Sequence, residues 1–116
     1  MSIGQSVSTV LKNYEVFRGR ASRPEFWWYY LVYVIATFII AFIDSAIGAN
    51  NVLLLIFALA LFLPTLAVTV RRLHDTDKSG WWVLIQLIPI VGWIIIIVFM
   101  ASKGTAGDNR FGAPVG

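Results

Sequence analysis

The chain is 116 residues long, which is enough for one domain. Hydrophobic residues make up 59% of it and charged residues 13%, whereas a typical globular domain is about 25% charged. A soluble fold of this size exposes too much surface to keep so many apolar side chains away from water. The composition therefore excludes an ordinary soluble domain and predicts an all-α integral membrane protein, with the lipid bilayer around its apolar surface.

The net charge of +3 comes from basic residues in the polar segments that flank the apolar ones. Basic residues in such positions usually set membrane topology or contact anionic headgroups. We therefore expect anionic lipids as partners and no nucleic acid. The chain has no cysteine, which excludes disulfides and thiolate metal sites.

The first segment, 4–18, is predicted to be an amphipathic helix. Its apolar residues recur at steps of three and four, which places on one helical face Ile3, Val7, Val10, Leu11, Tyr14 and Phe17. Next to a membrane span, we expect such a helix to lie in the headgroup plane with that face toward the acyl chains. The alternative is that it packs on the polar loops of the same chain.

Three transmembrane helices and a polar tail are predicted to follow, over 25–43, 52–70, 81–101 and 102–116. Each of the three apolar segments has about 20 residues, the length that crosses the hydrocarbon core. Ser22 and Glu25, with Pro24 between them, form a capping pattern that marks the start of the first helix. Pro64 is expected to kink the second helix.

The distribution of Lys and Arg predicts the orientation. The segment before the first span carries four, the first loop none and the second loop three, so the N-terminus is expected in the cytoplasm. A straight third span then places the tail outside, although the tail contains Lys103 and Arg110. The alternative is a break around Pro89 and Gly92, which makes 81–101 a re-entrant hairpin and returns the tail to the cytoplasm. The arms of that hairpin are too short to cross the bilayer, which favours the straight span.

No catalytic constellation is visible. After Glu25 the three apolar segments contain no charged residue and no histidine, whereas pumps and coupled transporters usually carry ionisable groups within the membrane. His74 is the single histidine, and no cysteine or activated serine accompanies it. Together with Asp75 and Asp77 it supplies too few ligands for a zinc site. We therefore expect no enzymatic activity, no metal and no cofactor.

Five residues in or next to the predicted spans are candidates for helix packing. Thr37, Ala41 and Ser45 are four residues apart, so they form a stripe of small side chains that lets another helix approach closely. Pro64 shapes the second span. Gln86 is the one amide side chain within a span and is expected to hydrogen-bond across helices.

Three stretches of the chain carry a family resemblance. In one-letter code they are FRGRASRPEFW at 17–27, RRLHDTDKSGWW at 71–82 and GDNRFG at 107–112. In this order and spacing the chain resembles the bacterial membrane family catalogued as domain of unknown function 805. The family pattern often has glycine where this sequence has Asp77, which weakens the prediction of a tight turn there.

The resemblance implies a small multi-pass protein of the bacterial inner membrane, with no assigned activity. Its motif residues all lie at the ends of spans. If the tail is cytoplasmic, we expect Arg20, Arg71, Asp75 and Arg110 to meet in one polar cluster. The candidates for that cluster, or for contact with lipid headgroups, are Arg18, Arg20, Arg23, Arg71, Arg72, His74, Asp75 and Arg110.

The leading functional prediction is a structural or accessory subunit that acts through helix–helix and lipid contacts. Its partners would be other membrane proteins or further copies of the same chain. The alternative is a small oligomeric transporter or channel, whose pore would be lined by Thr65, Thr69, Gln86 and the break at Pro89 and Gly92. The lack of charged residues within the spans favours the first prediction.

Overall fold

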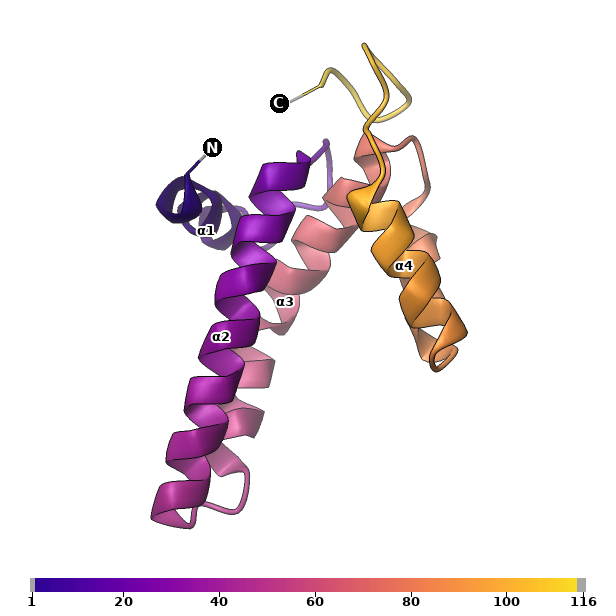
Figure 1. Cartoon of the computed structure of the whole chain (residues 1–116). Helices are drawn as coiled ribbons and strands as arrows, with labels where there is room; N and C mark the ends of the chain where they lie inside the picture. Colours follow the sequence, from indigo (N-terminus) through magenta and orange to yellow (C-terminus); the bar gives the residue numbers. More distant parts are fainter. Residues whose placement is uncertain (1, 115–116) are drawn as a thin grey trace.

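The computed structural model describes residues 2–114, which are helical apart from turns and an isolated bridge between Asn109 and Gly112. Its elements are, in chain order, α1 (Ile3–Lys12), α2 (Arg23–Ile47), α3 (Val52–Asp75), the 3-10 helix η1 (Gly80–Leu87) and α4 (Val91–Ala101). Figure 1 shows a long hairpin of α2 and α3, with α1 beside its upper end and a shorter hairpin of η1 and α4 descending from the same end. The all-α prediction is confirmed.

Local chemistry sets both ends of α2. Ser22 accepts a hydrogen bond from the Glu25 backbone amide at 3.4 Å, and Pro24 occupies the first turn, where a missing N–H costs nothing. At the other end Gly48 adopts a left-handed conformation, with a φ of 68°, and closes the helix. α2 is longer than the predicted span 25–43, because the residues from Asp44 to Ile47 continue the helix instead of forming a loop.

Asp44 joins the two long helices at the turn between them. Its buried carboxylate accepts hydrogen bonds from the backbone amides of Asn51 and Leu53, both at 2.8 Å, and of Leu54 at 3.4 Å. Amides in the first turn of a helix have no partner within it, and negative charge is favoured at that end of the helix dipole. The side chain at the N-cap position itself, Asn51, makes no capping bond. The first turn of α3 is therefore capped from α2.

Replacing Asp44 by alanine should lower the free energy of unfolding by about 1.5–3 kcal/mol, because three backbone amides lose a charged acceptor. Thermal unfolding in mild detergent, followed by circular dichroism, measures the loss. The matched control is Ser45→Ala, which changes the next residue of the same helix at an exposed position. It should alter stability by less than about 0.5 kcal/mol. Equal losses in the two variants would contradict the capping role.

The two long helices are both suited to crossing a bilayer. With 25 and 24 residues, α2 and α3 are each about 36–38 Å long, and both are apolar enough by composition. The Tyr29 and Thr65 hydroxyls form a hydrogen bond between them at 2.7 Å, and Tyr33 stacks on Phe57 with ring centroids 5.7 Å apart. A hydrogen bond between membrane helices contributes about 0.6 kcal/mol on average, so close packing supplies much of the contact. Pro64 is buried within α3, which continues through it.

The prediction that a loop begins at Arg71 is wrong. α3 continues past the predicted 52–70 to Asp75, because the polar side chains of its last turn find partners on neighbouring segments. Helical spacing places Arg72 and Asp75, three residues apart, on one face, where they form an ion pair. The helix therefore carries its charged end into the protein instead of into water.

The predicted single helix over 81–101 is wrong as well. The segment consists of the 3-10 helix η1, a reversal at 88–90 and the α-helix α4. Each arm is about 16 Å long, roughly half the thickness of the hydrocarbon core. The arms approach so closely that a Cβ on Gly92 would overlap the carbonyl oxygen of Ile85. Pro89 lies at the reversal, where its missing N–H interrupts no helix.

This reversal returns the tail to the end of the molecule where α2 begins. Figure 1 places the tail and α1 at the same end of the α2–α3 hairpin. Arg20 donates to the carbonyl oxygens of Thr105 and Gly107, at 2.6 and 2.7 Å. The tail therefore contacts the segment before α2, whereas a straight third span would place the two on opposite sides of the membrane. Arms too short to cross a bilayer are no obstacle to a hairpin that packs on α3 and turns back.

α1 ends at Lys12, six residues before the predicted end of segment 4–18, because Asn13 caps it and donates from its side chain to the Thr9 carbonyl at 2.8 Å. Its predicted apolar face is divided. Val10 is fully buried in the core with Ala21 and Phe26. The exposed members of that face include Ile3, Leu11 and Tyr14.

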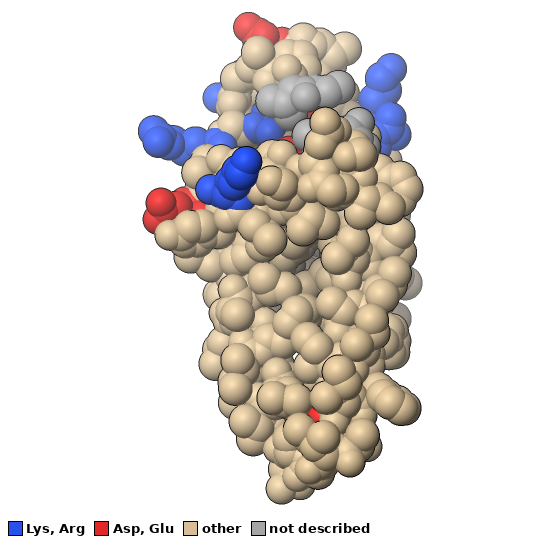
Figure 2. Space-filling view, turned by 90° about the vertical axis from the view of Figure 1, so that its left-hand side faces the viewer, with Lys and Arg blue, Asp and Glu red and all other residues tan. Residues whose placement is uncertain are grey.

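Basic and apolar side chains occupy different ends of the molecule. Figure 2 shows Lys and Arg gathered at one end, above a long surface that is tan apart from a small red spot near its far end. All nine Lys and Arg belong to the segments at the end where α2 begins and α3 finishes. Below that end, many large hydrophobic side chains of α2, α3, η1 and α4 are exposed, as contact with lipid requires.

Candidate functional site

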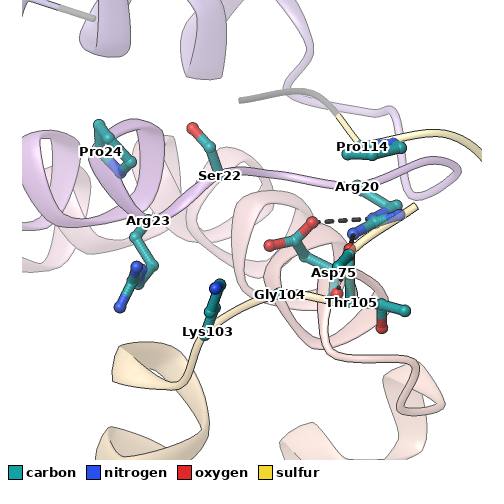
Figure 3. A pocket seen from close by; sticks show the side chains of 10 residues that line it. Arg20, Ser22, Arg23, Pro24, Asp75, Lys103, Gly104, Thr105 and Pro114 are labelled. Atoms are coloured by element: carbon teal, nitrogen blue, oxygen red, sulfur yellow. Dashed lines mark hydrogen bonds and ion pairs between the residues drawn. The ribbon is translucent and has the colours of Figure 1, made fainter. Parts of the chain in front are cut away.

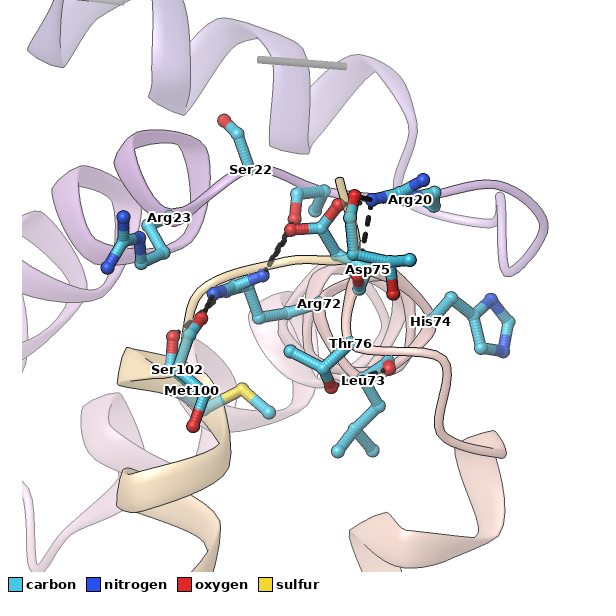
Figure 4. Close-up of polar contacts among 12 residues, drawn as sticks. Arg20, Ser22, Arg23, Arg72, Leu73, His74, Asp75, Thr76, Met100 and Ser102 are labelled. Carbon is cyan, nitrogen blue, oxygen red and sulfur yellow. Dashed lines mark hydrogen bonds and ion pairs between the residues drawn. The ribbon is translucent and has the colours of Figure 1, made fainter. Parts of the chain in front are cut away.

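Three charged residues meet around the last turn of α3. Arg20 reaches Asp75 from the segment before α2 (Figure 3), and Arg72 reaches it from one turn earlier on α3 (Figure 4). We call Arg20, Arg72 and Asp75 the arginine cluster. Their side chains are 1%, 0% and 10% exposed, so water and salt screen their interaction little.

Asp75 binds both arginines of the cluster. Its Oδ1 accepts a hydrogen bond from Arg20 Nε at 2.8 Å, and its Oδ2 accepts one from Arg72 Nη1 at 2.5 Å. Hydrogen bonds between charged groups are short and strong in such a setting. A single carboxylate between two guanidinium groups leaves an excess of positive charge, so the remaining arginine donors need neutral acceptors.

Arg20 obtains those acceptors from the tail. It donates to the carbonyl oxygens of Thr105 at 2.6 Å, Gly107 at 2.7 Å and Gly112 at 3.2 Å, and to the Asp75 carbonyl at 3.2 Å. Together with the bond to the Asp75 carboxylate, these contacts use all five N–H groups of the guanidinium. The tail is thus wrapped around one arginine side chain.

Arg72 binds the end of α4. It donates to the carbonyl oxygens of Met100 at 2.9 Å and of Ser102, and more weakly to that of Ala21 at 3.4 Å. Carbonyl groups at the C-terminal end of a helix lack partners within it and carry the negative end of its dipole, so a cation is favoured there. The arginine cluster therefore joins the segment before α2, the end of α3 and the end of α4.

Gly104 lets the tail pass directly over the cluster. A Cβ at this position would overlap the Asp75 carboxylate, which two arginines hold in place. In the same contact, the Thr105 amide donates to the Asp75 carbonyl at 2.7 Å. Sequence patterns do not single out Gly104, because the need for glycine comes from a contact with a residue 29 positions away.

A second buried ion pair lies next to the cluster. Arg71 Nη1 donates to Glu25 Oε2 at 2.5 Å, and Arg71 Nε and Nη2 have no partner within residues 2–114. The sequence pattern predicts a capping box for Glu25 and gives no signal for this pair. Only the Ser22 half of that box forms, because the buried guanidinium is a stronger partner for the carboxylate than a backbone amide.

His74 contacts the tail through its ring. The ring stacks on Phe111 with centroids 3.8 Å apart and 1° between the planes, and Nδ1 lies 3.0 Å from the Gly19 carbonyl oxygen. Asn109 donates to the His74 carbonyl at 2.9 Å. In the described part of the chain, no three His, Cys, Asp or Glu side chains are grouped as a metal site would require.

Arg110 does not meet the cluster. Its Nε lies 3.2 Å from Asp77 Oδ1, and the two side chains are 61% and 43% exposed. The neighbouring Phe111 faces inward to His74, which directs Arg110 to the surface. Asp77 has a φ of 60°, a left-handed conformation that glycine adopts easily, so the tight turn of the family pattern is present despite the aspartate.

The remaining candidates lie outside the cluster. Arg18 and Arg23 are exposed, and the hydrogen bond of Arg23 is a long one, 3.4 Å to the Ala101 carbonyl. The five helix-packing candidates lie away from the charged end: Thr37 and Ala41 are half-buried, Pro64 is buried, and Ser45 and Gln86 are exposed. Their part in helix association stays a prediction.

Comparison with known proteins identifies the family. The family model described as "Protein of unknown function (DUF805)" matches residues 14–113, which include the whole arginine cluster and the tail around it. The inner membrane protein YhaH of Escherichia coli (strain K12) is 51% identical over 108 residues, and the alignment covers 89% of each chain. The inner membrane protein YhaI of the same strain is 46% identical over 105 residues, covering 90% of this chain and 89% of its own.

A third relative of that strain, the uncharacterized protein YiiR, is 35% identical over 123 residues, covering 83% of each chain. No solved structure matches this chain. The family model extends from the segment before α2 into the tail, and each relative aligns with most of the sequence. The chain therefore belongs to the DUF805 family of proteins of unknown function.

Proposed function

We propose that this protein is a non-enzymatic accessory component of the bacterial inner membrane, which acts by associating with a second copy of itself at membrane level. The observation that carries the proposal is a groove of about 240 Å³ between α2, α3 and η1. The residues that line it include Tyr33, Phe62, Thr65, Thr69, Val83 and Gln86. Val83 and Gln86 of η1 form one wall of the groove, and its size suits the side chains of a further helix packed against it.

The non-enzymatic part of the proposal is supported by the arginine cluster. Both carboxylate oxygens of Asp75 and every N–H group of Arg20 are engaged by other protein groups. A general acid or base must be able to reach a substrate. The charged groups of the cluster are instead used in ion pairs and hydrogen bonds that hold three segments of the chain together.

The charges and the relatives support the proposed position in the membrane. YhaH and YhaI are inner membrane proteins by name. Because the re-entrant hairpin returns the tail, all nine Lys and Arg lie at the end of the α2–α3 hairpin where α2 begins, and none lies at the opposite end, where the two helices are joined. The positive-inside rule assigns the basic end to the cytoplasm, together with α1 and the tail. The conflict that a straight third span creates for Lys103 and Arg110 disappears.

A second copy suits the groove because of Gln86. This exposed side chain donates one hydrogen bond, to the Val83 carbonyl at 3.2 Å, and its amide oxygen has no partner among the described residues. A carboxamide carries both a donor and an acceptor, so two copies of Gln86 related by a two-fold axis can satisfy each other. Lipid tails contain no hydrogen-bond donor or acceptor for such a group. A hydrogen bond of this kind stabilises helix association in a membrane.

Replacing Gln86 by leucine should weaken self-association about eightfold, the effect of losing two reciprocal interhelical hydrogen bonds of about 0.6 kcal/mol each. The measurement is the dimer fraction by native mass spectrometry in nanodiscs or mild detergent, over a range of protein-to-lipid ratios. Leu87→Ala is the matched control, because it changes the next residue, which is exposed and does not line the groove. A wild-type protein that is monomeric at every ratio, or a dimer that Gln86→Leu leaves unchanged, would contradict the proposal.

One observation favours a second function, passage of a solute or ion through an oligomer. Thr65, Thr69 and Gln86 line the same groove, as expected of a pore. Two of them are already engaged, because the Thr65 hydroxyl bonds Tyr29 and the Thr69 hydroxyl donates to the Thr65 carbonyl at 2.7 Å. One free amide makes a poor conduction path, so association is the function that we prefer. Flux into proteoliposomes that Gln86→Leu abolishes would reverse this preference.

A further inference from the structure

A polar pocket of about 360 Å³ lies between the start of α2 and the tail. Four of the residues that line it are charged: Arg20, Arg23, Asp75 and Lys103. In Figure 3, Arg20 lies at one side of the pocket, and Arg23 and Lys103 lie at the other. The pocket therefore brings together the segment before α2, the first turn of α2 and the segment after α4.

Positive charge dominates this pocket. Asp75 is the one acid among its lining residues, and Arg20 and Arg72 occupy both of its oxygens. Arg23 and Lys103 form no ion pair within the described chain. The first turn of α2 adds the positive end of a helix dipole. An anion is the ligand that such a field favours, and two exposed cations are free to bind it.

An apolar seam lies next to this pocket, further along α2 and α4. It is a second, smaller cavity among α2, α3, η1 and α4, lined mainly by apolar side chains such as Trp27, Tyr30 and Ile97, and also by Thr65, Thr69 and Gln86. Trp27 is one helical turn after Arg23 on α2, and Met100 is three residues before Lys103. Tryptophan and tyrosine at this level mark the boundary between headgroups and acyl chains. A charged pocket and a mainly apolar one thus follow each other along α2 and α4.

We infer that this pocket is a binding site for an anionic phospholipid. Arg23 and Lys103 bind the phosphate, Arg20 and Arg72 supply a positive field behind them, and an acyl chain lies along Trp27 and Ile97 in the seam. A free phosphate would use only the charged half of the site. The stacking of the two cavities at the membrane boundary is what favours a lipid over a soluble anion.

The test compares lipid retention by the full chain. The protein is exchanged into mild detergent with equal amounts of phosphatidylglycerol and phosphatidylcholine, and native mass spectrometry counts the lipids that stay bound. The wild type should retain phosphatidylglycerol preferentially. The double variant Arg23→Gln, Lys103→Gln should bind it about thirtyfold less tightly, the effect of removing two basic groups near the lipid phosphate.

The matched control is the double variant Lys12→Gln, Arg18→Gln. It removes the same charge from the same end of the molecule, at exposed positions that do not line the pocket. It should keep the preference within about threefold of the wild type, because unspecific attraction to anionic lipid is the only term it weakens. Equal losses in the two double variants, or equal retention of both lipids by the wild type, would overturn the site.

Two further arms separate the lipid from a soluble anion. Ile97→Trp fills the apolar seam and should reduce retention of phosphatidylglycerol, whereas Ile94→Trp, on the same helix and exposed but outside the seam, should not. Glycerol phosphate, which has the headgroup chemistry without acyl chains, should fail to displace the lipid at millimolar concentration. Displacement by glycerol phosphate, with no effect of Ile97→Trp, would assign the pocket to a soluble phosphate and overturn the lipid site.

Discussion

Asp75→Asn should lower the free energy of unfolding by about 3–5 kcal/mol, the largest effect that we expect from a change to one side chain. The carboxamide keeps the shape of the carboxylate but leaves the guanidinium groups of Arg20 and Arg72 buried without a counter-charge. Those two arginines also hold the tail and the end of α4. Their repulsion should therefore release both segments together.

Two measurements test the predicted loss of stability in Asp75→Asn. Thermal unfolding in mild detergent reports stability, and limited trypsin digestion reports release of the tail, because Lys103 and Arg110 become easier to cleave. The matched control is Asp77→Asn, which removes an acid two residues away whose partner, Arg110, is 61% exposed. An exposed pair contributes at most about 1 kcal/mol. If the two variants lose the same stability, the arginine cluster does not hold the charged end together.

Gly92→Ala should destabilise the protein by about 1–3 kcal/mol or more, although it adds a single methyl group. The new Cβ would overlap the backbone carbonyl of Ile85, and a backbone carbonyl cannot rotate away as a side chain can. The two arms of the re-entrant hairpin must then separate. The matched control, Gly4→Ala in α1, adds the same group where no atom lies within 4 Å. It should gain about 0.5–1 kcal/mol, because alanine is the better helix former, so the two variants are expected to differ in sign.

The same hairpin can be checked in cells by cysteine labelling, since the chain has no cysteine of its own. Asp108→Cys places a thiol on the exposed tail, and Ser45→Cys places one near the opposite end of the α2–α3 hairpin. A membrane-impermeant thiol reagent should label Ser45→Cys in intact cells and Asp108→Cys only after permeabilisation. Labelling of both in intact cells would mean that 81–101 crosses the membrane and that the hairpin is not the structure in the bilayer.

Sequence alone was enough for the class of the molecule and for its two long helices. A run of about 20 apolar residues has few alternatives to a helix in lipid, because every backbone N–H and C=O must be satisfied within the segment. The start of α2 is equally local, since Ser22 and Pro24 act on their own turn. The family resemblance follows from the three charged motifs, and the matched residues 14–113 include all of them.

The arginine cluster was predictable only in part. Arg20, Arg72 and Asp75 were all candidates, because they lie in charged motifs at the ends of apolar segments. The pairing of Arg20 with Asp75, the exclusion of Arg110 and the pair of Arg71 with Glu25 were not predictable. These contacts join residues between 46 and 55 positions apart or depend on how the tail turns. Charge patterns show which residues need partners, but not which partner lies within reach.

Only the tertiary structure decided the path of the chain after Gly80. Twenty-one apolar residues place the same side chains in lipid as one straight helix or as two short arms, so side-chain hydrophobicity does not distinguish the two arrangements. The choice depends on contacts between segments: the close approach of Gly92 to Ile85, and the grip of Arg20 and Arg72 on the tail. A straight helix would carry the tail away from those arginines and leave their donors without acceptors in a buried site. The free-energy cost of those unpaired donors exceeds the cost of ending a short helix within the apolar region.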